Sequence, residues 1–178
     1  MASTKGGQTA AKVLAAIGVA AKKAESVRVG FLASAKYPDG TSVAMVAAIQ
    51  EFGAPKVRIP PRPFMRNTVA KYKDEWPDAI ANLLVENNYD AIKTLRIVGE
   101  VVKGQMQQEI VDTNAPSLSP VTLMLRKMRS QNPNLVVTGK TVGEAAARVK
   151  AGKSYAGVST KPLIYTDTMY KSVDFEVK

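Results

Sequence analysis

The chain contains no cysteine and no histidine among its 178 residues. Their absence excludes disulfides, thiolate nucleophiles, zinc sites of the Cys/His type, Ser-His-Asp triads and imidazole acid-base chemistry. Most enzyme classes need at least one of these devices. We therefore predict that the protein is not an enzyme and that it has no catalytic residue, cofactor or metal ion.

Long apolar runs are also missing. The longest, Val13 to Ala21, has nine residues, whereas a helix that crosses a bilayer needs about 20. We therefore expect no transmembrane helix and no membrane partner.

Negative charge is scarce, since 25 Lys and Arg face 15 Asp and Glu, a net charge of +10. The stretch Lys56 to Lys73 holds six basic residues and no acid, and Arg126 to Lys153 holds seven with Glu144 as the single acid. Such clusters attract DNA phosphates or an acidic protein surface, or they form a solvated face. The sequence leaves these alternatives open.

The hydrophobic content, 46%, suits one domain over residues 1–178 with a core of its own. Apolar residues at three- and four-residue steps predict helices over about 8–24, 42–52, 77–87 and 90–112. The last is the clearest, and Gly99 on its apolar stripe predicts that another element packs close there. A short basic helix is expected over 121–129 and an Ala-rich helix over 142–150.

Alternating apolar residues predict strands at both ends of the chain. Val27, Val29 and Phe31 alternate with polar residues or glycine, as do Val173, Phe175 and Val177, the period of a strand with one face on a core. We expect these two strands to pair, and Leu135 to Thr138 to form another short strand. The predicted fold class is α+β, a small antiparallel sheet packed against long helices.

Two chemical motifs fail on their spacing or context. Gly139-Lys140-Thr141 and Gly152-Lys153-Ser154 lack the glycine five residues earlier that a phosphate-binding loop requires. The acidic group Asp74, Glu75 and Asp78 offers oxygen ligands for a hard cation. It lies at a predicted helix start, however, where the helix dipole favours acids, so the structural interpretation is preferred.

Prolines define the segment between the second and third helices. Gly53 and Pro55 end the second helix, and Ile59-Pro60-Pro61-Arg62-Pro63-Phe64 is restricted to extended backbone. We predict a stiff proline-rich arm over about 54–66. Because it loses little entropy on binding, it could reach a neighbouring subunit, with Arg62 and Phe64 as anchors. In the alternative, Phe64 folds back onto its own core and Arg62 pairs with Glu51.

The order of these motifs resembles the tail-completion or head-tail joining proteins of long-tailed bacteriophages. That family typically has a helix ending in Glu-Phe-Gly, here Glu51-Phe52-Gly53, followed by Ile-Pro-x-Arg-Pro-Phe, here Ile59 to Phe64. Further similar pieces follow in the same order: the Ile97-Val98-Gly99 step, Pro116 to Thr122 and Pro162 to Val173. Asp167 stands where the family usually has glycine, and about 132–161 looks like an insertion.

The resemblance implies a small structural protein of the virion that assembles as a homo-oligomeric ring in the neck. Its partners would be itself, the phage connector or adaptor, and tail-tube or tail-terminator proteins, with channel DNA as a possible contact. A tail-terminator ring capping the tail tube is the first alternative, and a basic nucleic-acid-binding module is the second. Steep loss of DNA affinity with added salt would favour the second alternative.

Two sets of residues follow from the charge clusters and the resemblance. The interface candidates are basic or aromatic: Arg58, Arg62, Phe64, Arg66, Arg126, Lys127 and Arg129. The residues expected to shape the motif are Glu51, Phe52, Gly53, Pro63 and Gly99.

Overall fold

The computed structural model describes residue 12, residues 14–19 and residues 26–178. Within the helix predicted over 8–24, residues 14–19 are helical, and most of the remainder lies outside the described residues. All further statements concern the described part of the chain.

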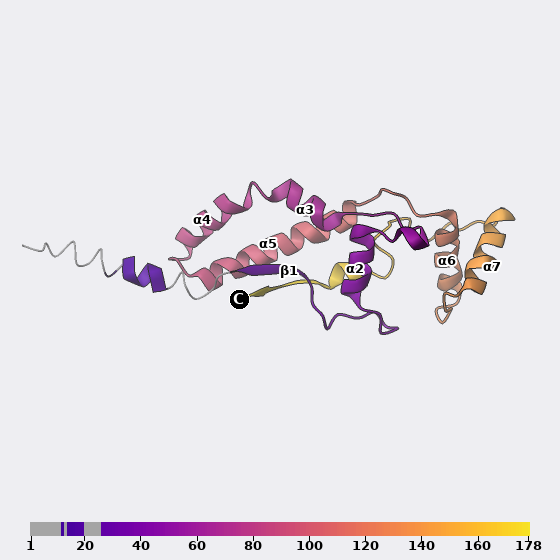
Figure 1. The fold of residues 1–178 in the computed structure, drawn as a ribbon, viewed down its shortest axis with the longest axis horizontal. Coiled ribbons are helices and arrows are strands. Elements are labelled where there is room, and N and C mark those ends of the chain that lie inside the picture. The colour runs from indigo at the N-terminus through magenta and orange to yellow at the C-terminus, as the bar shows by residue number, and fades with distance from the viewer. Residues whose placement is uncertain (1–11, 13, 20–25) are drawn as a thin grey trace, which may run out of the picture.

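A long helix, α5 (Ala91–Asp112), runs through the body of the molecule (Figure 1). Asp90 caps its start, since the carboxylate accepts a hydrogen bond of 3.0 Å from the backbone N–H of Lys93. Val98, Met106 and Ile110 are buried on the face that the heptad-like spacing predicts. The central helix expected from the sequence is thereby confirmed.

The two terminal strands pair as predicted. β1 (Val27–Phe31) and β2 (Val173–Val177) form an antiparallel ladder in which Val27 lies opposite Val177 and Phe31 opposite Val173. The sheet packs against α5. A small antiparallel sheet on a long helix confirms the α+β class.

At Gly99, α5 and the sheet approach each other closely. A Cβ atom built there would come within 2.6 Å of Phe175 Cε2, closer than side-chain atoms tolerate. The aromatic ring of β2 therefore occupies the space that any larger residue would need. This confirms the prediction that another element packs tightly at Gly99.

This contact gives a test within a single helix. Gly99→Ala is expected to lower the free energy of unfolding by about 1–2 kcal/mol, because overpacking against Phe175 outweighs the gain in helix propensity of about 1 kcal/mol. Gly104→Ala in the same helix has no heavy atom within 4 Å of the new Cβ, so it should be stabilising. Urea unfolding of both variants measures the difference. Equal effects at the two positions would contradict the packing account.

Three shorter helices precede α5 in the chain. α2 (Val43–Phe52) starts at Ser42, whose hydroxyl accepts from Met45 N, and stops at Gly53 with φ 76°. α3 (Phe64–Tyr72) and α4 (Trp76–Glu86) lie along one side of α5 (Figure 1). α2 and α4 match the predicted helices, but α3 was not predicted.

The proline-rich segment folds onto its own chain. A short 3₁₀ turn, η1 (Pro55–Val57), begins it, and Ala54 pairs with Ile59 across that turn. Pro60 to Pro63 then runs into α3 without helix or strand, and Phe64 is fully buried. The segment is proline-rich and extended in part, but its last side chain belongs to the core instead of reaching outward.

The main core collects side chains from both ends of the sequence. Phe64 meets the edge of Phe31, with ring centroids 6.0 Å apart and planes at 78°. The other buried residues of this core come from α2, α5, β2, the short helix α8 (Thr168–Lys171) and the loop before α8. They are Val43, Ala47, Met106, Ile110, Leu163, Met169 and Val173.

A helical hairpin stands at one end of the molecule (Figure 1). α6 (Pro120–Gln131) and α7 (Gly139–Lys150) pack on each other around Met124, Met128 and Ala145. The strand predicted at Leu135 to Thr138 is wrong, because this segment is irregular and pairs with no strand. Leu135 packs against the hairpin core instead.

Candidate assembly surface

Glu51 joins the end of α2 to the start of α3. The carboxylate is 2% exposed and accepts hydrogen bonds from the backbone N–H groups of Met65 (2.9 Å) and Arg66 (3.2 Å). Pro63, at the N-cap of α3, makes no side-chain cap, so Glu51 satisfies the free donors of this helix from outside it. We call this arrangement the Glu51 clasp.

Arg66 completes the Glu51 clasp from the solvent side. Its Nε donates to Glu51 Oε1 over 2.8 Å, and its Nη2 donates to the Glu51 carbonyl over 2.7 Å. The same guanidinium lies 5.3 Å from the centre of the Phe52 ring, a cation–π distance. Two consecutive residues of the motif therefore differ in burial, since Glu51 is buried and Phe52 is 68% exposed.

The exposed side of α2 and α3 is apolar with a basic rim. A shallow groove of about 510 Å³ is lined there by Glu51, Phe52, Met65, Arg66, Val69, Ala70 and Lys73. Val69 is 49% exposed and Phe52 is more exposed still. Exposed apolar side chains gathered in one place mark interaction surfaces more often than isolated ones do.

Arg62 holds the proline-rich segment against the linker that precedes α6. It is 4% exposed, and it donates from Nη1 to Gln50 Oε1 over 3.0 Å and from Nε to the Pro116 carbonyl over 2.9 Å. Burial lowers the pKa of this guanidinium from its ordinary value. Glu51 pairs with Arg66 and not with Arg62, so that part of the folded-back alternative is wrong. The other part of that alternative is confirmed, because Phe64 is buried in the core of its own chain.

Arg126 plays the same internal role in the second basic cluster. It is 8% exposed, and its Nη1 donates to the carbonyls of Ser159, Lys161 and Ile164 over 2.7–3.2 Å. The guanidinium lies 4.9 Å from the centre of the Tyr165 ring. Burial lowers the pKa of Arg126, although Tyr165 opposes the shift. Arg126 therefore fixes the loop that leads to α8.

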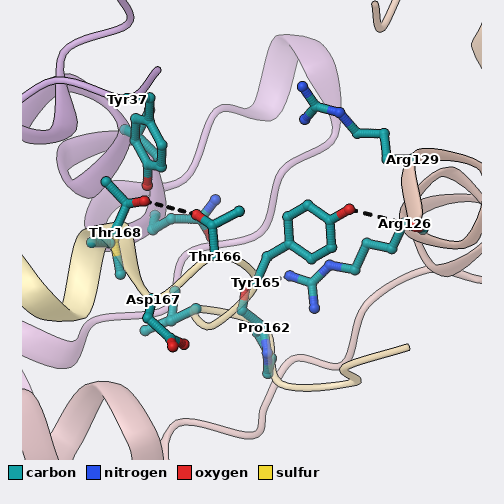
Figure 2. Close-up of a pocket in the computed structure, with 12 residues that line it drawn as sticks. Tyr37, Arg126, Arg129, Pro162, Tyr165, Thr166, Asp167 and Thr168 are labelled. Carbon is teal, nitrogen blue, oxygen red and sulfur yellow. Dashed lines mark hydrogen bonds between the residues drawn. The ribbon is translucent and has the colours of Figure 1, made fainter. Parts of the chain in front are cut away.

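A hollow of about 200 Å³ lies beside Arg126 (Figure 2). In Figure 2 the Tyr165 hydroxyl reaches the Arg126 carbonyl, and Arg129 projects away from the Arg126 guanidinium. The hydroxyls of Thr166 and Thr168 are 2.9 Å apart. Between them, Asp167 has φ 57° and ψ 0°, so an aspartate takes the left-handed backbone conformation that glycine adopts most easily.

The remaining candidates lie at or near the surface. Arg58 is exposed at the end of η1 with φ 57°, and Lys127 donates from Nζ to the Ala156 carbonyl over 2.9 Å. On α7, Lys140, Arg148 and Lys150 are exposed. The structure thus divides each basic cluster into one buried arginine that holds the fold and several exposed charges.

Sequence reasoning missed several residues that build this region. The Gln50 side chain and the carbonyls of Pro116 and Ser117 accept hydrogen bonds from Arg62. Val69 supplies the exposed apolar surface of α3. Backbone carbonyl acceptors leave no signal in a sequence. The spacing Arg66, Val69, Ala70, Lys73 is a helical face, and it could have predicted α3.

Neither a metal centre nor a membrane span is found within the described residues. No group of three or more acidic side chains is placed there to hold a metal ion. No helix in this part is long and apolar enough to cross a bilayer. Trp76, beside the acidic group, donates from Nε1 to Gln105 Oε1 over 2.9 Å and so links α4 to α5.

Comparisons with protein-family models, curated proteins and solved structures give no match for this chain.

Proposed function

We propose that the protein is a structural component of a tailed-bacteriophage virion that acts in head-tail joining, as a subunit of a ring between connector and tail. The observation that carries this proposal is the motif of Glu51 to Gly53 and Ile59 to Phe64, which resembles the motif of that family. Its residues form one physical unit, in which Glu51 holds α3, Arg62 holds the linker before α6, and Phe64 enters the core. These contacts give the motif residues a structural role in this chain.

The exposed surface is consistent with a subunit that works in an assembly. Phe52 and Val69 lie open beside Arg66 and Lys73, and aromatic and arginine side chains dominate the energetics of protein interfaces. The proposed partners are other copies of this chain, the connector or adaptor, and the tail-tube or tail-terminator proteins. The net charge of +10 suits an acidic protein rim or channel DNA. We propose no enzymatic activity.

Electron microscopy of lysates tests this proposal. A phage that carries this gene is compared with its deletion derivative and with the derivative supplied with the intact chain. Filled heads beside free tails of normal length are expected in the deletion lysate, because heads and tails would mature but not join. Whole particles should return when the chain is supplied.

Two other outcomes would contradict head-tail joining. Tails of uncontrolled length in the deletion lysate would favour a tail terminator instead. Ordinary infectious particles without the gene would overturn both virion functions.

A further inference from the structure

Charge is segregated along the chain where α3 passes into α4. Residues 56–73 hold six basic side chains and no acid. Residues 74–90 hold five acids and no basic side chain: Asp74, Glu75, Asp78, Glu86 and Asp90. Neighbouring blocks of opposite sign give one molecule two complementary surfaces.

The first block contributes to what we call the basic surface, made of Met45 and Phe52 on α2, Arg66 and Val69 on α3, and Lys73 at the C-cap of α3. Met45 is 53% exposed, and Phe52 follows it two turns later on the same face of α2. Arg66, Val69 and Lys73 follow helical spacing on α3, and all are exposed. This surface combines an apolar centre with two cations.

The second block forms what we call the acidic surface, made of Asp78, Asn82, Val85 and Glu86 on α4. Asp78, Asn82 and Val85 follow the i, i+4, i+7 spacing of one helix face, and Val85 is 60% exposed. α4 buries none of its residues fully within this chain. An apolar side chain flanked by carboxylates is the chemical complement of the basic surface.

We infer that the basic surface of one copy binds the acidic surface of the next copy. This inference rests on the proposed ring function and specifies its subunit contact. The two surfaces differ within one chain, so their pairing is heterologous, and a heterologous contact generates a ring when its rotation closes. Apolar contact among Phe52, Val69 and Val85 supplies burial, and the charges set direction and register.

Charge reversal tests the pairing in phage particles. Lys73→Glu and Glu86→Lys, each supplied to the deletion phage, are expected to lower the yield of joined particles about tenfold or more, because each places like charges across the contact. Combining both changes in one chain should restore most of the yield, since the pair is regenerated. Glu100→Lys on α5 is the matched control and should leave the yield unchanged.

A lower yield of joined particles with Glu86→Lys would not result from misfolding of this variant. A lysine at the C-terminal end of α4 is favoured by the helix dipole, so this variant should fold as well as the parent. Urea unfolding of each purified variant checks this. A double variant as defective as its single parents would overturn the pairing.

The lack of cysteine allows an independent test by cross-linking. Val69→Cys and Val85→Cys chains are supplied together to the deletion phage, and purified particles are treated with a short bismaleimide. A cross-linked dimer is expected only when both variants are present, since the basic surface of a Val69→Cys copy then meets the acidic surface of a Val85→Cys copy at some of the contacts. Dimers from either variant alone would indicate a symmetric contact and would overturn the inference.

The outcomes separate this inference from the function on which it rests. Chains present in particles that join normally but show no cross-link in the mixture would overturn the surface pairing while head-tail joining stands. Full infectivity of the deletion phage without any supplied chain would overturn the function itself.

Discussion

Phe64→Ala is expected to lower the free energy of unfolding by about 3–5 kcal/mol, a large share of the about 5–15 kcal/mol that a folded protein has. Phe64 is fully buried, and its ring packs edge-on against Phe31. Truncation removes this contact and leaves a cavity among side chains from α2, α5 and the loop before α8. Urea unfolding measures the loss, and Phe64→Leu, which fills most of the space, should lose less than half as much.

Phe52→Ala is the matched control, because Phe52 belongs to the same motif but is 68% exposed. We expect its free energy of unfolding to change by no more than about 0.5 kcal/mol. The yield of joined particles should fall nonetheless, since Phe52 lies at the centre of the basic surface. Equal destabilisation by Phe52→Ala and Phe64→Ala would contradict the division of the motif into a core residue and a surface residue.

Glu51→Ala is expected to cost about 2–4 kcal/mol of unfolding free energy, because its carboxylate accepts several hydrogen bonds that water cannot readily replace. The backbone N–H groups of Met65 and Arg66 at the start of α3 would lose their acceptor. The loss should appear in urea unfolding as a lower midpoint. Loosening of α3 should also appear as faster hydrogen exchange of its first-turn amides.

Arg66→Ala separates the roles of the two partners in the Glu51 clasp. The Arg66 side chain is 59% exposed and that of Glu51 is 2% exposed. We expect Arg66→Ala to cost no more than about 1 kcal/mol, as for an ion pair screened by water. If the two variants were equally unstable, the Arg66–Glu51 ion pair would be the main contribution and the capping of α3 would not.

Elements with a strong period or a clear stop signal were predictable from the sequence. The spacing of apolar residues gave the position of α5, and alternation located β1 and β2 with their pairing. Ser42 and Gly53 delimited α2 as a cap and a stop. These signals are local, so they survive without knowledge of the tertiary packing.

Elements that depend on contacts distant in sequence were not predictable. α3 starts directly after Pro63, and its free N–H groups are satisfied by Glu51, which precedes it by more than ten residues. Leu135 to Thr138 has strand-like composition but no strand beside it to pair with. β propensity describes a fit to a half-buried sheet, and here the hairpin core takes Leu135 instead.

The candidate surface was predictable from the sequence only in part. The sequence predicts Arg62 and Phe64 as interface anchors, or in the alternative Phe64 as part of its own core with Arg62 paired to Glu51, and both side chains are buried in their own chain. Arg126 is likewise internal, held by carbonyl groups that a sequence does not display. The exposed surface beside Arg66 includes Phe52, which the sequence predicts as a residue that shapes the motif and not as an interface residue.

Localisation in the virion tests the central claim most directly. A single cysteine at an exposed position away from both surfaces, such as Val101→Cys on α5 (Val101 is 49% exposed), can be labelled with gold without a second thiol in the same chain, and particles with the unchanged chain give the background label. Electron microscopy of intact particles carrying this chain should show the label at the junction of head and tail. Label spread along the tail or over the capsid would contradict the account, and so would intact particles that contain no copy of the chain.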